Sequence, residues 1–463
     1  MKNKYVDLIE QSFEFPTEEF KVENDELYWF NVPLMDLIKQ YGTPLRIAYL
    51  PKIAQNIKSA RRMFNVAMAK VDYQGDYNYC YCTKSSHFSF VMEEVLKHDV
   101  NIETSSAFDV NLLDALLEEG MLVKDKYIIC NGFKRPQYVE GIQNLINEGF
   151  ENVVPILDNV FELDQLLEGF DKPFKVGIRV ATEEEPKFEF YTSRLGMCYK
   201  DIIPYYEEKI KDNNQVQLKM LHFFINTGIR DTSYYWNELN RCVEKYCELR
   251  KICPTLDSLN IGGGLPIQAH LDFTYDYAYM VEEIVSQIKN TCNLNGVPEP
   301  NIFTEFGSYT VGESGAMLYS IVNQKKQNDR ELWNMIDSSF ITTLPDTWAI
   351  DQRFPFLAVN NWDKEYERVH LGGLTCDSQD YYNAEAHSNA IFLPKYAPDR
   401  DQYIGFFHMG AYQEALSGFG GIQHCLIPAP KLVIIELDEN GEYYTKLFAK
   451  EQSYKSMMKI LGY

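Results

Sequence analysis

The sequence has no long apolar run, no excess of basic residues and no repeated cysteine motif. No apolar stretch reaches the roughly 18 residues that a membrane-spanning helix requires, so we expect no membrane association. Lysine and arginine total 44 against 67 aspartates and glutamates, a formal net charge of −23. Because such a chain repels phosphate backbones, nucleic acid is not an expected partner. The acidic field favours cationic small molecules, although solubility alone also explains it.

The 10 cysteines do not follow the pattern of a small disulfide-stapled domain. Cys80 and Cys82 have the wrong spacing for a zinc knuckle, and no second pair complements them, so we expect no metal site. Residues Met1 to Glu19 are polar and mixed, unlike a signal peptide. These features predict a reduced, cytoplasmic protein.

Short apolar segments alternate with helical patterns through the first two thirds of the chain. The predicted strands are Tyr79–Thr83, Val100–Thr104, Lys126–Cys130, Val153–Leu157, Lys175–Val180, Leu218–Ile225, Ser258–Ile261 and Ile302–Glu305. Strand–helix alternation is typical of a parallel sheet in an α/β protein. Eight such units favour a closed, TIM-like (β/α)8 barrel, with an open doubly wound sheet as the alternative.

The periodicity changes after residue 310. Segments such as Tyr403–Phe407 and Lys431–Leu437 are short, apolar and separated by Gly, Pro and Asp, which predicts a mainly β domain. We therefore expect three parts: residues 1–50, which complete the β domain; the barrel, 51–310; and the β-rich domain, 311–463.

Three features fall at predicted strand ends, where barrel enzymes carry their active sites. Lys84 follows the first strand, Gly262, Gly263 and Gly264 follow the seventh, and Glu305 ends the eighth. By itself, Lys84 could simply extend its ammonium to water, and Glu305 could form a structural ion pair. Together, a Schiff-base lysine, a phosphate-binding glycine loop and a carboxylate for the pyridine nitrogen match the needs of pyridoxal 5'-phosphate.

Five motifs in one order resemble the alanine-racemase-fold (fold type III) pyridoxal phosphate decarboxylases, the group that includes ornithine, diaminopimelate and biosynthetic arginine decarboxylases. They are Tyr81–Lys84, Asn260–Pro266, Glu305–Gly307, Thr375–Ser378 and Met409–Tyr412. The arginine branch is the most similar, through Cys130–Lys134, Leu344–Gln352, Thr375–Ser378 and Gly410–Glu414.

The resemblance implies a role for each motif residue. Cofactor-binding residues are Lys84, Phe224, Thr227, Gly263, Gly264, Glu305, Gly307 and Tyr412. Cys376 would protonate Cα from across a homodimer interface with shared sites, whereas Asp377 and Asp346 would bind the cationic end of the substrate. Two positions depart from the family. Phe224 replaces a stacking His, and Ser308 replaces a phosphate-binding Arg, for which Arg230 could compensate.

The implied reaction is decarboxylation of a basic L-amino acid, with arginine conversion to agmatine in polyamine biosynthesis as the leading expectation. Ornithine, lysine or diaminopimelate decarboxylation is an alternative. A non-catalytic regulatory homologue is another alternative, favoured by Phe224 and Ser308 and opposed by Lys84, Glu305 and the three glycines.

Overall fold

The computed structural model describes residues 15–183, 193–329, 331–382 and 391–463. The first 14 residues of the predicted N-terminal segment lie outside this description. The chain divides into two compact units. One, here called the β unit, comprises residues 1–53, 267–274 and 311–463; the other, the barrel unit, comprises 54–266 and 275–310.

The barrel unit contains a closed barrel of parallel strands, as the sequence predicts. Its strands are β5 (Tyr77–Cys82), β6 (Asn101–Thr104), β7 (Tyr127–Cys130), β8 (Asn152–Leu157), β9 (Phe174–Arg179), β10 (Val216–His222), β11 (Ser258–Asn260) and β12 (Asn301–Phe306). The order is β10-β11-β12-β5-β6-β7-β8-β9, and β9 closes the ring onto β10. The prediction of a closed barrel is confirmed, and the open-sheet alternative is wrong.

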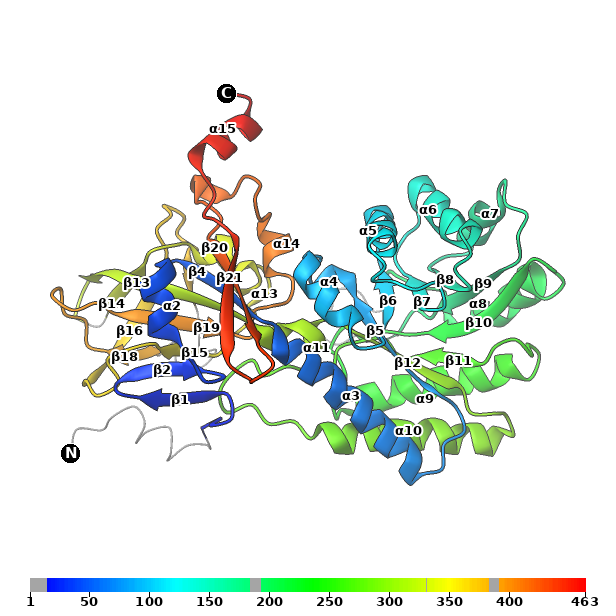
Figure 1. Cartoon of the computed structure of the whole chain (residues 1–463). Helices are drawn as coiled ribbons and strands as arrows, with labels where there is room; N and C mark the ends of the chain where they lie inside the picture. The colour runs from blue at the N-terminus through cyan, green and yellow to red at the C-terminus, as the bar shows by residue number, and fades with distance from the viewer. Residues whose placement is uncertain (1–14, 184–192, 330, 383–390) are drawn as a thin grey trace. The chain divides into compact units, whose positions relative to one another are not determined.

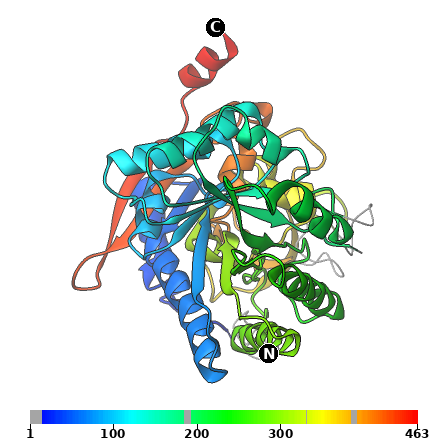
Figure 2. The same cartoon turned by 90° about the vertical axis from the view of Figure 1, so that its right-hand side faces the viewer.

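Both faces of these strands are buried, which explains their nearly continuous apolar sequences. Cys80, Ile129, Val154, Met220 and Phe303 belong to one buried cluster. Helices cover the outside of the ring (Figure 2). They are α3 (Leu50–Lys70), α4 (Ser89–Leu96), α5 (Ala107–Glu118), α6 (Pro136–Asn147), α7 (Glu162–Leu167), α8 (Tyr199–Tyr205), α9 (Ser233–Arg250) and α10 (Tyr277–Asn295).

Local capping explains where several helices begin. At the start of α5, Ser106 and Asp109 form a capping box, so the chain turns sharply after β6. Thr232 caps α9 and Asp276 caps α10 through a single bond each, accepted from the backbone amides of Tyr235 and Tyr279. These turns bring the residues that follow each strand to the carboxyl end of the barrel.

The β unit is built on strands that are distant in sequence (Figure 1). A 3-stranded sheet has the order β1-β2-β3, and a 10-stranded sheet has the main path β17-β16-β14-β13-β4-β20-β21. The strands are β1 (Phe20–Glu23), β2 (Glu26–Trp29), β3 (Val32–Pro33), β4 (Leu45–Tyr49), β13 (Gly315–Lys326), β14 (Leu332–Ile336), β15 (Phe356–Ala358), β16 (Tyr366–Gly372), β17 (Tyr381–Tyr382), β18 (Ile391–Pro394), β19 (Tyr403–Phe407), β20 (Lys431–Leu437) and β21 (Tyr443–Ala449). Its helices are α2 (Leu34–Tyr41), α12 (Phe340–Thr343), α13 (Pro345–Ile350), α14 (Gln413–Ser417) and α15 (Tyr454–Leu461).

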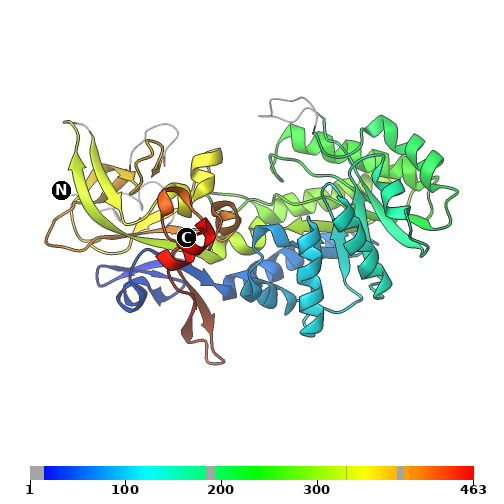
Figure 3. The same cartoon turned by 90° about the horizontal axis from the view of Figure 1, so that it is seen from above.

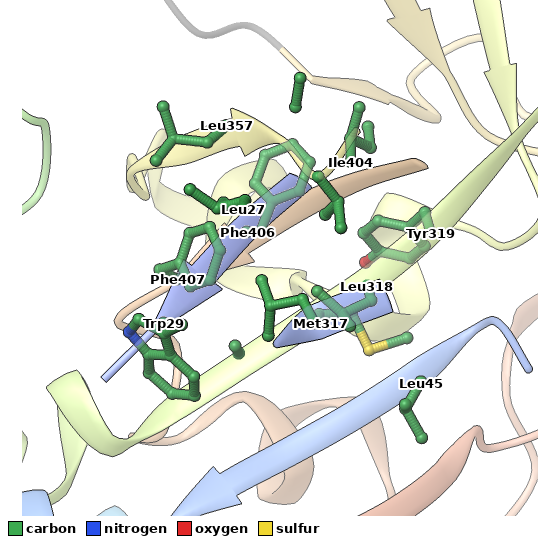
Figure 4. Close-up of a cluster of buried hydrophobic side chains, with 14 of the residues drawn as sticks. Leu27, Trp29, Leu45, Met317, Leu318, Tyr319, Leu357, Ile404, Phe406 and Phe407 are labelled. Atoms are coloured by element: carbon green, nitrogen blue, oxygen red, sulfur yellow. The ribbon is translucent and has the colours of Figure 1, made fainter. Parts of the chain in front are cut away.

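Strand β4 explains why the N-terminal segment belongs to this unit. It pairs with β13 in antiparallel and with β20 in parallel orientation, so it lies in the middle of the sheet. Strand β20 continues into β21 as a hairpin (Figure 3). The core beside β4 gathers Leu45, Met317, Leu318 and the rings of Phe406 and Phe407 (Figure 4). Among the described residues, no helix is both long and apolar enough to cross a bilayer.

The apolar contact between sheet and helices should dominate the stability of the barrel unit. Leu259 on β11 is 0% exposed, whereas Leu294 on α10 is 88% exposed. We expect Leu259→Ala to reduce the free energy of unfolding by about 2–5 kcal/mol, because it removes buried methyl groups and leaves a cavity. Urea denaturation followed by circular dichroism measures this. Leu294→Ala is the matched control, and equal effects of the two substitutions would contradict the packing described here.

Candidate active site

Lys84 is the middle residue of a short 3-10 turn, Thr83–Ser85, which directly follows β5. Its side chain is 41% exposed, and Nζ donates to Oε2 of Glu103 at 2.6 Å. Glu103, on the neighbouring strand β6, is fully buried. The ammonium therefore reaches both water and a buried carboxylate. A lysine held in this way has access to an incoming carbonyl group.

Glu305, on β12, accepts three hydrogen bonds from buried side chains. Oε1 accepts from Nδ2 of Asn260 at 2.7 Å and from Nδ2 of Asn131 at 2.9 Å, whereas Oε2 lies 3.2 Å from Nε2 of His222. Burial opposes the charged form, but His222, Lys84 and the Asn131 hydrogen bond outweigh it and lower the pKa of Glu305 to about 2. Glu305 is thus an ionised carboxylate inside the barrel. Its hydrogen-bond partners are two asparagines and a histidine rather than a lysine or an arginine.

Glu103 lies in the opposite electrostatic situation. Burial raises its pKa, Lys84 opposes that effect, and the negative charge of Glu305 adds to it. Oε1 of Glu103 accepts from the same Asn131 amide that bonds Glu305. Two carboxylates with different proton affinities are therefore joined through one asparagine.

The glycine loop after β11 is fixed against neighbouring backbone. Gly264 has φ +94°, and a Cβ there would lie 2.7 Å from the Cα of Gly228. A Cβ on Gly263 would collide with the carbonyl oxygen of Glu305. Oδ1 of Asn260 accepts from the Gly262 amide at 2.9 Å, so the residue that bonds Glu305 also orients this loop. Bare backbone in this position suits a phosphate group.

The predicted partners of the glycine loop follow β10. Phe224 is partly exposed, and the Arg179 guanidinium lies 5.8 Å from its ring centroid. Thr227 is partly exposed, and the amide of Ile229 donates to the carbonyl of Gly264, which joins the two loops. Arg230 is exposed, and its Nε donates to the carbonyl of Thr227 at 3.2 Å.

Gly307 fills a position with no room for a side chain. A Cβ there would collide with the Ser85 hydroxyl beside Lys84. The turn that carries Lys84 and the turn that follows β12 are therefore packed directly together. This contact explains the glycine in the Glu305–Gly307 motif on steric grounds.

The β unit carries the other predicted residues. Cys376 and Asp377 are exposed in the loop between β16 and β17. Asp380 fixes that loop, because its Oδ2 accepts from the backbone amide and hydroxyl of Thr375 at 3.1 and 2.7 Å. Nε2 of His424 lies 3.7 Å from Oδ2 of Asp377.

Asp346 and Tyr412 are linked through Gln413. Nε2 of Gln413 donates to Oδ2 of Asp346 at 2.7 Å, and burial raises the pKa of this aspartate. Tyr412 precedes α14 with φ +68°, an uncommon backbone conformation for a tyrosine. The ion pair between Glu414 and the buried Arg46, at 2.8 Å, ties the same helix to β4.

Comparison with known proteins identifies the barrel. Residues 54–312 match the family model described as pyridoxal-dependent decarboxylase, pyridoxal binding domain. The chain belongs to the pyridoxal-dependent decarboxylases.

Members of related groups align over most of this decarboxylase. A biosynthetic arginine decarboxylase of Geobacter sp. (strain M21) is 23% identical over 529 residues, which cover 88% of this chain and 82% of the relative. The structure of biosynthetic arginine decarboxylase SpeA from Campylobacter jejuni has a TM-score of 0.81 at 20% identity, covering 97% of this chain and 90% of that one. Diaminopimelate decarboxylase from M. jannaschii has a TM-score of 0.80 at 16% identity, covering 96% and 98%. These structures share the fold of the decarboxylase.

The cofactor of this decarboxylase is pyridoxal phosphate, and the barrel residues fit it. The site offers an accessible amine on Lys84, an ionised carboxylate on Glu305 and bare backbone at Gly263 and Gly264. Sequence reasoning missed Glu103 and Asn131. Both lie at the carboxyl ends of predicted strands, Glu103 within Val100–Thr104 and Asn131 directly after Lys126–Cys130. Because barrel enzymes carry their active sites at these ends, the position of the two residues could have identified them as candidates.

The charge of Glu305 should make apoprotein stability depend on pH. Its pKa falls from an ordinary 4.5 to about 2, so ionised Glu305 stabilises the fold above pH 4.5, and this contribution disappears as pH falls through the folded-state value. We expect Glu305→Gln to lower the urea midpoint at neutral pH, and the deficit to shrink as the buffer is acidified below about pH 4.5. Glu283→Gln, at an exposed position on α10, is the control. A deficit that stays constant with pH would contradict the ionised state.

Proposed function

We propose that this decarboxylase acts on a basic L-amino acid, and that arginine, which yields agmatine for polyamine biosynthesis, is its substrate. The supporting observation is the joint presence of the Lys84–Glu103 pair, the ionised Glu305 and exposed Asp377 in a chain whose relatives include biosynthetic arginine decarboxylases. A formal charge of −23 suits a cationic substrate, since an acidic field raises its local concentration.

We assign cofactor binding to the barrel, residues 51–310. Lys84 would hold the cofactor aldehyde covalently, and Glu305 would accept a hydrogen bond from the pyridine nitrogen and keep it protonated. Gly263, Gly264, Gly307 and Thr227 would hold the phosphate, and the Phe224 ring would stack on the cofactor. The family motif assigns Tyr412, outside these residues, to the phosphate as well. When bound, pyridoxal phosphate withdraws electrons from Cα, so that the substrate carboxylate can leave as CO₂.

The remaining steps belong to the chain's own side chains. When the substrate amine takes its place on the cofactor, Lys84 would be released as an amine, and Glu103, which accepts from its Nζ in the structure, would keep it in the site. Cys376 delivers a proton to Cα after CO₂ leaves. Asp377 accepts hydrogen bonds from the guanidinium, and Asp346, which Gln413 orients, supplies a second carboxylate for the same cation.

We propose that Cys376, Asp377 and Asp346, which lie in residues 311–463, act on the site of the partner subunit in a homodimer. Cys376 and Asp377 are exposed on the β unit, and apolar side chains are exposed on the same unit: Trp348, Ile350, Leu374 and Leu416. On the barrel unit, Phe108, Phe133 and Phe161 are exposed after three successive strands. A second copy of the chain would cover both sets, which a monomer leaves in water.

The location that we propose is the cytoplasm. All ten cysteines are free thiols in the structure, which suits a reducing compartment.

The alternative function, a regulatory homologue without activity, is favoured by Phe224 and Ser308 in place of two cofactor-binding residues.

Substrate choice can be tested directly. The protein reconstituted with pyridoxal phosphate is assayed for CO₂ release from arginine, ornithine, lysine and diaminopimelate. We expect arginine to give the highest kcat/KM, with agmatine as the product, and we expect Lys84→Ala to reduce release to background because the covalent link to the cofactor is lost. A higher kcat/KM with another amino acid would replace arginine as the proposed substrate. No release from any of them, with no cofactor bound, supports the regulatory homologue.

Shared sites can be tested by mixing inactive variants. After Lys84→Ala and Cys376→Ala proteins are dissociated and reassembled together, about a quarter of wild-type activity should return, because half of the dimers are hybrids with one intact site. Mixing Lys84→Ala with Glu305→Gln is the control. Both of those changes affect the barrel, so no hybrid contains an intact site. Equal activity in the two mixtures would show that Cys376 serves its own chain.

A further inference from the structure

We propose that Asn131 is a positioning residue. Its amide keeps the carboxylates of Glu103 and Glu305 charged at the same time, and it orients Glu103 toward Lys84 and Glu305 toward the pyridine nitrogen. The inference rests on the roles of Lys84 and Glu305 proposed above. It concerns a residue that binds neither the substrate nor the phosphate.

The geometry of the amide supports this role. Nδ2 of Asn131 donates to Oε1 of Glu103 at 2.9 Å and to Oε1 of Glu305 at 2.9 Å. An ionised carboxylate only accepts hydrogen bonds, so the NH₂ group must face both acids and the amide has one possible orientation. All three side chains are buried, and Oδ1 of Asn131 has no hydrogen-bond partner among the described residues. Both N–H bonds are thus committed to the two acids.

The loop that follows β7 holds Asn131 in place. The backbone amide of Asn131 donates to the carbonyl of Thr104 on β6 at 2.9 Å. Three residues later, Lys134 is completely buried, and its Nζ donates to Glu162 at 3.2 Å and to the carbonyl of Gly132 at 2.9 Å. The amide of Lys134 also donates to Glu162, at 3.0 Å. Asn131 is therefore held on both sides by contacts that do not involve the acids it bonds.

The need for a double donor follows from electrostatics. Two buried carboxylates repel each other, and the proximity of Glu305 already raises the proton affinity of Glu103. Protonation of Glu103 would deprive Lys84 of its anionic partner, and protonation of Glu305 would leave the pyridine nitrogen without one. The amide of Asn131 disperses both charges at once. Aspartate has the same size but replaces the two donors with a third acid.

The experiment measures how apoprotein binds pyridoxal phosphate and how the absorbance of the bound cofactor changes with pH. In Asn131→Asp, we expect affinity to fall about tenfold, because hydrogen bonds to two charged groups are lost. We expect the pH midpoint of the absorbance change to rise by about one unit, because added negative charge favours the protonated nitrogen between Lys84 and the cofactor. Thermal unfolding of apoprotein checks that each variant folds.

A double variant separates charge from packing. Asn131→Asp combined with Glu103→Gln has the native number of carboxylates, so its midpoint should return to within about half a unit of wild type. A shift that persists would be caused by altered packing and would overturn the inference. An unchanged midpoint in Asn131→Asp would also overturn it. Asn147→Asp, at an exposed position on α6, controls for one added charge.

Two further variants remove ambiguity. Where Asn131→Asp does not fold, Asn131→Ala removes both donors without adding charge. Glu103 then binds a proton more readily and Lys84 loses its anionic partner, so the midpoint should fall, and an unchanged value overturns the proposal. Lys84→Ala tests the proposed function separately. If it keeps the wild-type absorbance, the covalent role of Lys84 fails. If it loses that absorbance while the Asn131 variants behave as wild type, only the role of Asn131 fails.

Discussion

The buried, ionised carboxylate of Glu305 is the interaction on which the carboxyl end of the barrel depends. A charge removed from water is costly unless hydrogen bonds replace its hydration. Glu305 obtains them from Asn131, Asn260 and His222, which follow or end three other strands. The charge can therefore be maintained only when those strands are correctly in register. A pyridine nitrogen that must stay protonated requires such an anion, so the needs of the cofactor and of the fold coincide.

The same constraint reaches the phosphate loop. Asn260 donates to Glu305 and accepts from Gly262, and the Glu305 amide donates to the carbonyl of Gly262 at 2.8 Å. The carboxylate that we propose for the ring nitrogen and the loop that we propose for the phosphate are consequently joined in one hydrogen-bonded assembly. This rigidity bears on Ser308, the position at which the family resemblance implies an arginine. Backbone that is already oriented loses little entropy on binding an anion, so a missing side-chain charge can be tolerated.

How far the sequence could predict this arrangement differs between the two units. All eight barrel strands were predictable because parallel strands buried on both faces are continuous apolar runs. Lys84 alone could have been an ordinary strand-end lysine, and only its combination with the glycine triplet, Glu305 and the ordered motifs predicted a role. The sheet order of the β unit was not predictable. Strand β4 pairs with β13 and β20, which lie hundreds of residues later, and short strands contain no information about partners so distant in the chain. Glu103 and Asn131 were missed because polar residues at strand ends are ordinary, and only barrel closure brings them together.

The difference between Glu103 and Glu305 is the last consequence of this network. Both are buried glutamates bonded by the same amide. Burial and Glu305 raise the pKa of Glu103, whereas His222, Lys84 and the Asn131 hydrogen bond keep the pKa of Glu305 low. Environments that separate the proton affinities of two acids assign them different chemistry. Glu305 is suited to a permanent charge opposite the pyridine nitrogen. Glu103 keeps its charge against burial through Lys84 and the Asn131 amide, which both lower its pKa. The network therefore places two buried anions on either side of Asn131, and each depends on different neighbours for its charge.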